Sequence, residues 1–131
     1  MIVADASVLL EILLRTDAGE EAQRRLFLRL ESLHAPELVD LEIAQVLRRY
    51  VLRRELTPFR ATAALKLFRR FPVERYGHAP LLPRIWELRE NLAAYDAAYV
   101  ALAEALRAPL VTCDARLAAS PGIRTQIEVV G

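Results

Sequence analysis

Short, almost wholly apolar runs alternate along the chain with longer stretches in which apolar residues recur every three or four positions. The short runs are typical of strands buried inside a parallel sheet, and the longer stretches are typical of helices with one apolar face. We predict an α/β fold in which a central parallel sheet of about five short strands is flanked by helices. The predicted strands are Ile2–Ala4, Leu33–Ala35, Phe71–Arg75, Pro109–Cys113 and Ile127–Val130.

The predicted helices have recognisable starts and stops. Ser7 is a suitable N-cap for a short helix over residues 7–14, and Asp17 opens a helix over residues 18–30. Pro36 fits the start of a long helix that reaches residue 56, where Thr57 and Pro58 end it and begin the next, through residue 70. Further helices are predicted over residues 80–91, 94–107 and 114–119. No linker or repeat interrupts this pattern, so we interpret residues 1–131 as one domain.

Composition narrows the protein class without naming a function. Hydrophobic residues make up 54% of the 131 residues, which is enough for a buried core. Cys113 is the single cysteine, so an internal disulfide is excluded and a reducing cytoplasm is the expected location. No run approaches the roughly 20 apolar residues that span a bilayer, and the N-terminus lacks a signal-peptide pattern. The net charge of +1 does not by itself indicate a nucleic-acid partner.

Four acidic residues lie at or beside the places where an α/β sheet opens its ligand crevice. Asp5 and Asp114 directly follow predicted strands, Asp96 opens a helix, and Glu42 lies early in the long helix. Ligands bind outside the carboxyl ends of parallel strands, so we expect these carboxylates to converge on one pocket. Four carboxylates in one pocket would repel one another unless a cation neutralised them. The sequence therefore predicts a site for a hard divalent ion, Mg²⁺ or Mn²⁺, and a metal-dependent phosphoryl-transfer reaction.

Each acid also has an ordinary structural explanation. Asp5 and Asp114 could cap turns, and a helix dipole favours Asp96 near a helix N-terminus. Glu42 and Asp40 flank the same apolar arc of the long helix, and periodicity does not choose between them. These explanations are weaker jointly than singly, because one crevice would collect all four acids. Thr112, two residues before Asp114, would add a hydroxyl to its rim.

Four motifs, in the same order along the whole chain, resemble those of PIN-domain proteins. They are Ile2-Val3-Ala4-Asp5-Ala6-Ser7-Val8-Leu9, Ala35-Pro36-Glu37-Leu38 through Glu42 to Arg49, Tyr95-Asp96-Ala97-Ala98-Tyr99-Val100-Ala101-Leu102-Ala103, and Thr112-Cys113-Asp114-Ala115-Arg116-Leu117. Size and motif order look most like the VapC toxins of toxin–antitoxin pairs. The third motif is the most specific match, and the four acids show no departure from the family pattern.

The resemblance implies a Mg²⁺- or Mn²⁺-dependent endoribonuclease that hydrolyses RNA phosphodiester bonds with a metal-activated water. It also implies a homodimer silenced by a small VapB-type antitoxin. Carried over by motif, Asp5, Glu42, Asp96 and Asp114 are the catalytic, metal-binding acids, and Thr112 and Ser7 are auxiliary residues.

Two other functions compete with this interpretation. A phosphatase with an aspartyl nucleophile requires a second acid two residues after the first, and Ser7 stands there instead. A non-catalytic protein of the same fold would be favoured by an incomplete acidic set, and this set is complete. The absence of a glycine-rich phosphate loop gives ATP or NAD binding no support.

Several other residues receive structural or accessory interpretations. His34 and His78 are interpreted as structural or exposed, Cys113 as a buried strand residue, and Trp86 and Tyr99 as packing residues. Arg48 and Arg89 are candidates for gripping flanking phosphates. Leu38, Leu41 and Leu52 form a second stripe on the long helix, which is either a partner surface or packing against a neighbouring helix.

Overall fold

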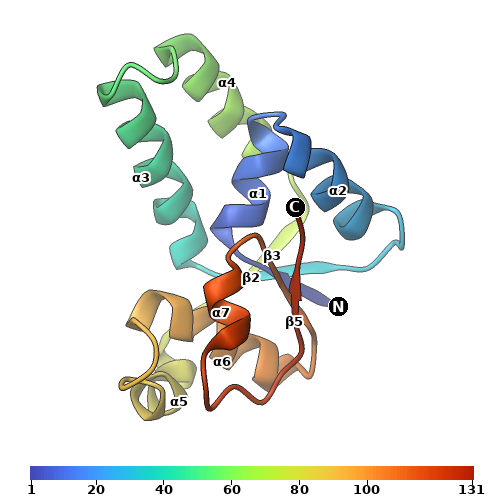
Figure 1. Cartoon of the computed structure of the whole chain (residues 1–131), viewed down its shortest axis with the longest axis vertical. Coiled ribbons are helices and arrows are strands. Elements are labelled where there is room, and N and C mark those ends of the chain that lie inside the picture. Colours follow the sequence, from blue (N-terminus) through green and yellow to red (C-terminus); the bar gives the residue numbers. More distant parts are fainter.

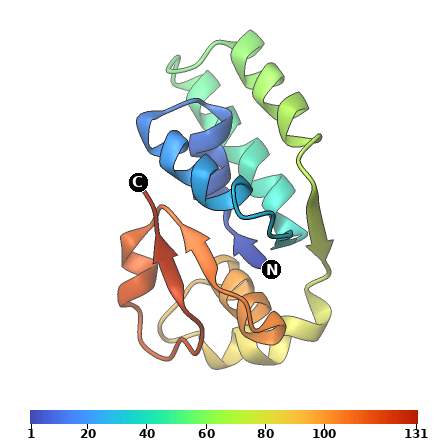
Figure 2. The ribbon, with the colours of Figure 1, turned by 90° about the vertical axis from the view of Figure 1, so that its right-hand side faces the viewer.

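A computed structural model describes residues 1–131 as a five-stranded parallel sheet with helices on both faces (Figures 1 and 2). The strand order is β3-β2-β1-β4-β5, which confirms the predicted fold class. The strands are β1 (Ile2–Ala4), β2 (Leu33–Pro36), β3 (Val73–Tyr76), β4 (Leu110–Thr112) and β5 (Ile127–Val129).

The central strand β1 is where the sheet changes its direction of growth. The chain adds β2 and then β3 on one side of β1, and later adds β4 and β5 on the other side. Val3 pairs with His34 of β2 and with Leu110 of β4. A crevice forms beyond the carboxyl ends of strands at such a reversal, so this topology favours a site between the ends of β1 and β4.

The helices form two groups around the sheet. They are α1 (Ala6–Leu13), α2 (Asp17–Phe27), α3 (Leu38–Leu52), α4 (Pro58–Phe68), α5 (Leu82–Glu87, after a 3-10 turn over Ala79–Leu81), α6 (Ala94–Leu106) and α7 (Ala115–Ala119). The α1–α4 helices lie on one side of the sheet, where α3 and α4 form a projecting pair, and α5 and α6 lie on the other (Figure 1). No helix is both long and apolar enough to cross a membrane.

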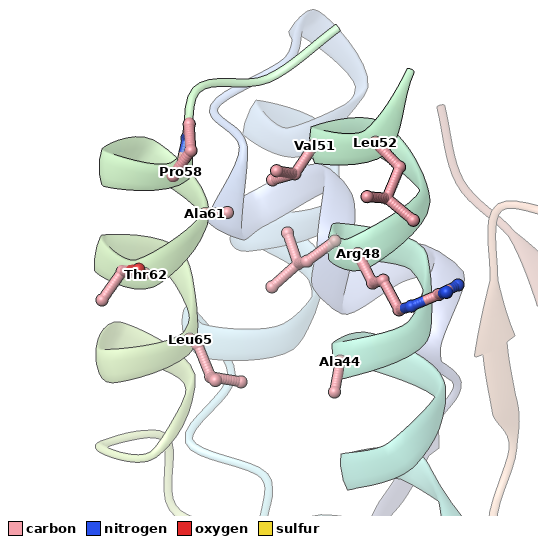
Figure 3. Close-up of a pocket in the computed structure, with 9 residues that line it drawn as sticks. Ala44, Arg48, Val51, Leu52, Pro58, Ala61, Thr62 and Leu65 are labelled. Carbon is pink, nitrogen blue, oxygen red and sulfur yellow. The ribbon is translucent and has the colours of Figure 1, made fainter. Parts of the chain in front are cut away.

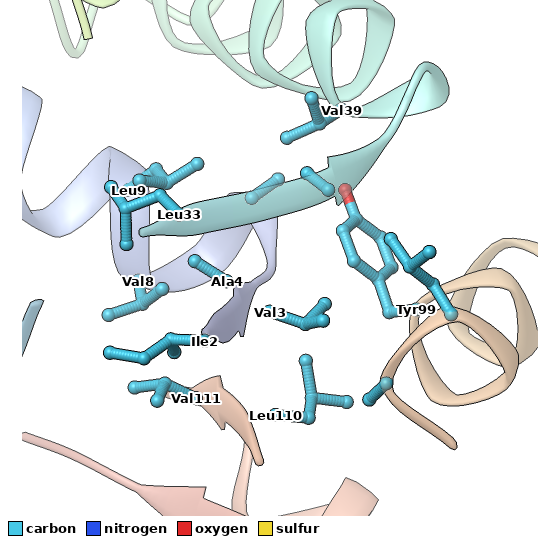
Figure 4. Close-up of a cluster of buried hydrophobic side chains, with 14 of the residues drawn as sticks. Ile2, Val3, Ala4, Val8, Leu9, Leu33, Val39, Tyr99, Leu110 and Val111 are labelled. Atoms are coloured by element: carbon cyan, nitrogen blue, oxygen red, sulfur yellow. The ribbon is translucent and has the colours of Figure 1, made fainter. Parts of the chain in front are cut away.

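The core is built around β1, whose three residues are at most 1% exposed. Figure 4 shows Leu110 and Val111 of β4 beside them, with Leu33 of β2 and Tyr99 of α6 closing the cluster. The α6 helix is rich in alanine from Ala97 to Ala103, and these small side chains are buried. Small residues allow the helix backbone to approach the sheet closely, which brings the start of α6 to the edge of the crevice.

Several predicted boundaries were wrong, for local reasons. The N-cap of α1 is Asp5 rather than Ser7, because the Asp5 carboxylate accepts the Val8 amide proton. Pro36 belongs to β2, and Glu37 N still donates to Tyr76 O of β3, so α3 begins only at Leu38.

Helix ends were also predicted too late. The α3 helix ends at Leu52, and Arg54 shortly after it has a positive φ although it is not glycine. The α2 helix ends at Phe27, and Leu30 shortly after it likewise has a positive φ. Residues 80–91 form a 3-10 turn and a short helix rather than one helix. Cys113 lies just after β4 and is only half-buried, so its interpretation as a buried strand residue was wrong.

Both histidines have structural roles, as interpreted. His34 is buried in β2, where Nδ1 lies 2.7 Å from Tyr76 Oη and Nε2 lies 2.7 Å from Ser32 Oγ. Burial lowers the pKa of His34, although the negative charge of Glu74 partly opposes this shift. The ring is therefore neutral at neutral pH. His78 Nε2 accepts a hydrogen bond from Leu38 N and thereby satisfies an amide at the start of α3.

An open apolar groove of about 300 Å³ lies between α3 and α4. Val51 of α3 and Leu65 of α4 point into the space between the two helices (Figure 3). Its lining residues are Ala44, Leu47, Arg48, Val51, Leu52, Pro58, Ala61, Thr62 and Leu65. Leu52 and Leu65 thus belong to one surface rather than being isolated exposed residues.

A glycine in the first turn of α2 allows α1 and α2 to pack closely. A Cβ atom added at Gly19 would lie 2.3 Å from Glu11 O, a backbone atom of α1. We therefore expect Gly19→Ala to lower the free energy of unfolding by about 1–3 kcal/mol, because one helix must move.

The matched control is Gly77→Ala, where an added Cβ would meet nothing within 4 Å. Urea denaturation of both variants is the measurement, and Gly77→Ala should change the free energy of unfolding by less than about 1 kcal/mol. Equal stability of the two variants would show that α1 and α2 are not in close backbone contact.

Candidate active site

One cavity of about 400 Å³ collects all four predicted acids. Asp5 follows β1 and Asp114 follows β4, while Glu42 comes from α3 and Asp96 from the first turn of α6. The predicted convergence at the carboxyl ends of the central strands is therefore confirmed. Ser7 also lines the cavity, whereas Thr112 is fully buried behind it.

Asp5 is the buried floor of the cavity. Its Oδ1 accepts from Ser7 Oγ at 2.6 Å and from Val8 N at 3.2 Å, and its Oδ2 accepts from Thr112 Oγ1 at 2.5 Å. Burial raises the pKa of Asp5, these three hydrogen bonds oppose the rise, and the charge of Asp96 adds to it. The carboxylate is therefore held in one orientation by donors on both β1–α1 and β4.

Ser7 and Thr112 link Asp5 to the turn that carries Asp114. Ser7 Oγ accepts from Cys113 N at 2.9 Å, and Thr112 Oγ1 accepts from Asp114 N at 3.0 Å. Each hydroxyl thus donates to the Asp5 carboxylate and accepts from the backbone after β4. The two predicted auxiliary residues position acids from two separate strands relative to each other.

Asp114 is the N-cap of α7 and is paired with an arginine. Its Oδ1 accepts from Arg116 N at 3.0 Å, and the Arg116 guanidinium reaches both oxygens, at 3.2 and 3.3 Å. The Arg116 hydrogen bond lowers the pKa of Asp114. Asp114 therefore caps a helix and also lines the acidic cavity, so the two explanations of this residue do not exclude each other.

The structure selects Glu42 rather than Asp40 for the cavity. Tyr99 Oη donates to Glu42 Oε1 at 2.6 Å. Burial raises the pKa of Glu42, the Tyr99 hydrogen bond opposes this, and the charges of Asp96 and Asp5 add to it. Asp40 instead pairs with Arg75 Nε at 2.8 Å, away from the cavity lining.

Asp96 lies at the exposed rim of the cavity, near the N-terminus of α6. Partial loss of water raises its pKa, and the negative charge of Asp114 raises it further. Asp96 is also a source of the charge that raises the pKa of Asp5 and Glu42. Repulsion among the four carboxylates is thus centred on this residue.

The arginines that line the cavity are Arg49 and Arg116. Arg48 lines the α3–α4 groove, and Arg89 lies 4.8 Å over the Trp86 ring and donates to Trp86 O. Arg48 and Arg89, the candidates for gripping flanking phosphates, therefore do not line the acidic cavity. Arg49 could have been found from sequence, because it lies seven residues after Glu42 and so on nearly the same helix face.

Two further expectations concern Cys113 and the aromatic residues. Burial and the charge of Glu11 raise the pKa of the Cys113 thiol to about 11, which disfavours a thiolate nucleophile. Tyr99 is a buried packing residue as interpreted, and it also donates to Glu42. Trp86 is 68% exposed, so its interpretation as a packing residue was wrong.

The donor set suits a hard divalent cation in its chemistry. All four groups are carboxylates, and their mutual repulsion is relieved by a cation that accepts oxygen ligands. No three acidic, histidine or cysteine side chains lie close enough in the structure to hold an ion together. Arg116, which is paired with Asp114, would compete with a cation for this carboxylate.

Comparisons with known proteins agree with this geometry. The PIN domain description matches residues 2–122. A protein named VapC ribonuclease Mb0985, from Mycobacterium bovis, is 48% identical over 99% of this chain and 98% of its own length. Ribonuclease VapC12 from Mycobacterium tuberculosis is 42% identical over 99% of each chain.

Solved structures of low sequence identity share the fold. PAE2754 from Pyrobaculum aerophilum matches 98% of this chain and 83% of its own, with a TM-score of 0.71 and 23% identity. A structure of VapBC2 from Rickettsia felis, bound to a DNA fragment from the VapBC2 promoter, matches 100% of this chain and 100% of its own chain, with a TM-score of 0.73 and 16% identity. From the domain match and the close relatives together, we conclude that this chain belongs to the PIN-domain family and, within it, to the VapC ribonucleases.

Proposed function

We propose that this protein is the endoribonuclease toxin of a VapBC-type toxin–antitoxin pair and hydrolyses RNA phosphodiester bonds at its four-acid cavity. The observation that carries the proposal is that Asp5, Glu42, Asp96 and Asp114 line one cavity at the reversal point of the sheet. Relatives named ribonucleases at 48% and 42% identity support the same activity. We expect the protein to act in the cytoplasm, where RNA substrates are available.

We propose Mg²⁺ or Mn²⁺ as the cofactor, with Asp5, Asp96 and Asp114 as its protein ligands and Glu42 completing the acidic ring. When bound, such an ion lowers the pKa of water and offsets negative charge on the phosphate. Ser7 and Thr112 hold Asp5 in orientation, so that its ligand oxygen does not have to be ordered during binding.

The remaining residues of the cavity bind and orient the RNA. The Arg116 guanidinium is 93% exposed and Arg49 lines the same cavity, so both can reach phosphates next to the scissile bond. Asp5 is recessed, with 8% of its surface exposed. A flexible single strand can bring its phosphate into such a recess more readily than a rigid duplex can, so we propose unpaired RNA as the substrate.

The competing functions fit this geometry less well. A phosphatase with an aspartyl nucleophile requires a second acid two residues after Asp5, whereas Ser7 stands there and donates a hydrogen bond to Asp5 Oδ1. A non-catalytic protein would have no need for four acids in one cavity, where burial and the charge of neighbouring acids raise the pKa of Asp5, Glu42 and Asp96. Endoribonucleolytic hydrolysis accounts for both features.

One prediction compares two acids on α3. Glu42→Gln should reduce RNA cleavage strongly, because the charge is lost while the Gln oxygen can still accept from Tyr99. Asp40→Asn should leave cleavage unchanged, because Asp40 pairs with Arg75 outside the cavity. Cleavage of a panel of structured RNAs, with Mg²⁺, Mn²⁺ or a chelator, is the measurement.

Asp96→Asn extends the same test, and it should abolish cleavage without destabilising the protein, since Asp96 is a source of repulsion. Asp5→Asn is less informative, because Asp5 also caps α1 and binds two hydroxyls. Cleavage that persists in chelator, or an Asp96→Asn variant as active as wild type, would overturn the metal-dependent mechanism.

Another prediction concerns the hydroxyl of Thr112. Thr112→Val keeps the buried shape but removes the donor to Asp5 and the acceptor for Asp114 N. We expect cleavage to fall roughly tenfold to a hundredfold through misplaced acids. The free energy of unfolding should fall by about 1–3 kcal/mol through unsatisfied buried groups.

Thr112→Ser retains the hydroxyl and is the matched control for this substitution. It should keep most of the activity while losing the methyl contacts. Measurement of cleavage rate and urea stability on both variants separates the two roles. If Thr112→Val cleaves RNA as fast as Thr112→Ser, the hydroxyl does not position the acids.

We propose that a VapB-type antitoxin docks an apolar helix in the α3–α4 groove. The groove is lined mainly by apolar side chains, and Leu52 at its edge is 64% exposed. Amphipathic helices bind such grooves through residues spaced three and four apart. The Rickettsia felis protein of the same fold is a VapBC2 assembly, which supports a partner of this class.

A further prediction tests this groove by charge. Leu52→Glu should weaken capture of a co-expressed VapB-type antitoxin and reduce the rescue of growth by that antitoxin, while RNA cleavage by the toxin alone is unchanged. Leu82→Glu, at a leucine that is 56% exposed outside the groove, is the control and should preserve rescue. Equal rescue of growth with both variants would show that the antitoxin binds another surface of the toxin.

We also propose that the toxin forms a homodimer. The support is the 54% hydrophobic content and the number of large apolar side chains left exposed in one chain. We expect sedimentation of the purified toxin as a dimer at micromolar concentration. Sedimentation as a monomer at high micromolar concentration, with and without antitoxin, would contradict this proposal.

A further inference from the structure

A second groove, of about 480 Å³, continues from the acidic cavity along α3. The two hollows share Glu42, Val46 and Arg49 as lining residues. The rest of the second groove is lined by Leu38, Leu41, Gln45 and Tyr95. A ligand that occupies the acidic cavity can therefore extend past Arg49 into this groove.

The groove has a different chemical character from the acidic cavity. Leu41 is 75% exposed and Tyr95 is 68% exposed, so an aromatic ring and an apolar side chain face solvent together. Glu42 at the shared boundary is the one acid in the lining, and Gln45 contributes an amide with both donors and an acceptor. This combination suits a flat, apolar group with polar edges.

A nucleobase has that character. Bases of single-stranded RNA stack on aromatic side chains, and their edges form hydrogen bonds with amide groups. Arg49 stands between the two hollows, where its guanidinium can bind the phosphate that joins a nucleotide in the cavity to the next one. Tyr95 directly precedes Asp96, so it lies in the same helical turn as a candidate metal ligand.

We propose that this groove is a nucleobase subsite, in which one unpaired base adjacent to the scissile phosphate stacks on Tyr95 and contacts Gln45. The inference rests on the proposed ribonuclease function, because it assigns the neighbouring nucleotide of the same substrate. The competing occupant is a second copy of this chain. Gln45 offers an amide to a base edge, and Arg49, which lines both hollows, offers a guanidinium to a phosphate. These polar groups favour an RNA strand over an apolar protein surface.

The test uses two RNA probes and three substitutions. The probes are a short oligoadenylate and an oligomer of the same length made of abasic ribonucleotides, and binding is measured by fluorescence anisotropy in the Asp96→Asn background. Tyr95→Leu keeps an apolar side chain but removes the ring, and Tyr95→Phe keeps the ring. Trp86→Leu removes an equally exposed aromatic residue outside the groove, and is the matched control.

We expect Tyr95→Leu to weaken oligoadenylate binding roughly fivefold to a hundredfold and to leave binding of the abasic oligomer unchanged. Tyr95→Phe and Trp86→Leu should bind both probes like the parent protein. Equal losses on both probes, or no loss on either, would overturn the subsite. A change in sedimentation instead of base binding would assign the groove to a second copy.

Failure of the subsite is distinguishable from failure of the proposed function. Wild-type protein that cleaves RNA while Tyr95→Leu cleaves and binds equally well disproves the subsite alone. Protein that cleaves no RNA, but whose oligoadenylate binding depends on Tyr95, disproves the nuclease and retains a base-binding groove. Cleavage mapping with the same substitutions adds a readout, because loss of the ring should relax the base preference on one side of the cut.

Discussion

The Asp5 carboxylate is the group on which the rest of the site depends. It is buried at the end of the central strand, where an unsatisfied charge would cost several kcal/mol. Ser7 and Thr112 satisfy it, and the same two hydroxyls accept backbone protons from the turn after β4. The need to satisfy one buried acid therefore fixes the relation between β1 and β4, and with it the position of Asp114.

The other three acids are held less tightly, and this difference suits a site that must accept an ion. Glu42 has one hydrogen bond from Tyr99, Asp114 is paired with an exposed arginine, and Asp96 lies at the rim. Burial, and then repulsion from neighbouring acids, raises the pKa of Asp96 and Glu42, so the cluster is an unfavourable arrangement without a bound cation. Arg116 offsets part of that repulsion, and a divalent cation would offset more of it. The same four carboxylates thus lower the stability of the fold and raise the affinity of the site for a cation, a trade-off that is common at active sites.

Much of this could be predicted from sequence, because the relevant signals are local. Apolar runs followed directly by an acid identified Asp5 and Asp114, and parallel topology then implied one shared crevice. The choice between Glu42 and Asp40 could not be made, since it depends on Tyr99 and Arg75, which approach α3 from distant parts of the chain. Helix ends were missed where Leu30 and Arg54 adopt positive φ without glycine, which leaves no compositional signal.

The α3 helix carries four surfaces with different tasks, and their arrangement limits how the protein can be silenced. Val39 and Ile43 face the core, and Glu42 and Arg49 face the acidic cavity. Leu41 and Gln45 face the second groove, and Ala44 and Val51 face the groove shared with α4. An antitoxin helix seated only in the α3–α4 groove would leave the four acids open to RNA. Silencing therefore requires one of two things: the antitoxin chain continues around α3 to cover Arg49, or its binding moves α3 and withdraws Glu42 from Tyr99. Because α3 packs through Ile43 and Leu47 into the core, a rigid shift would be costly, and a covering segment is the less demanding mechanism.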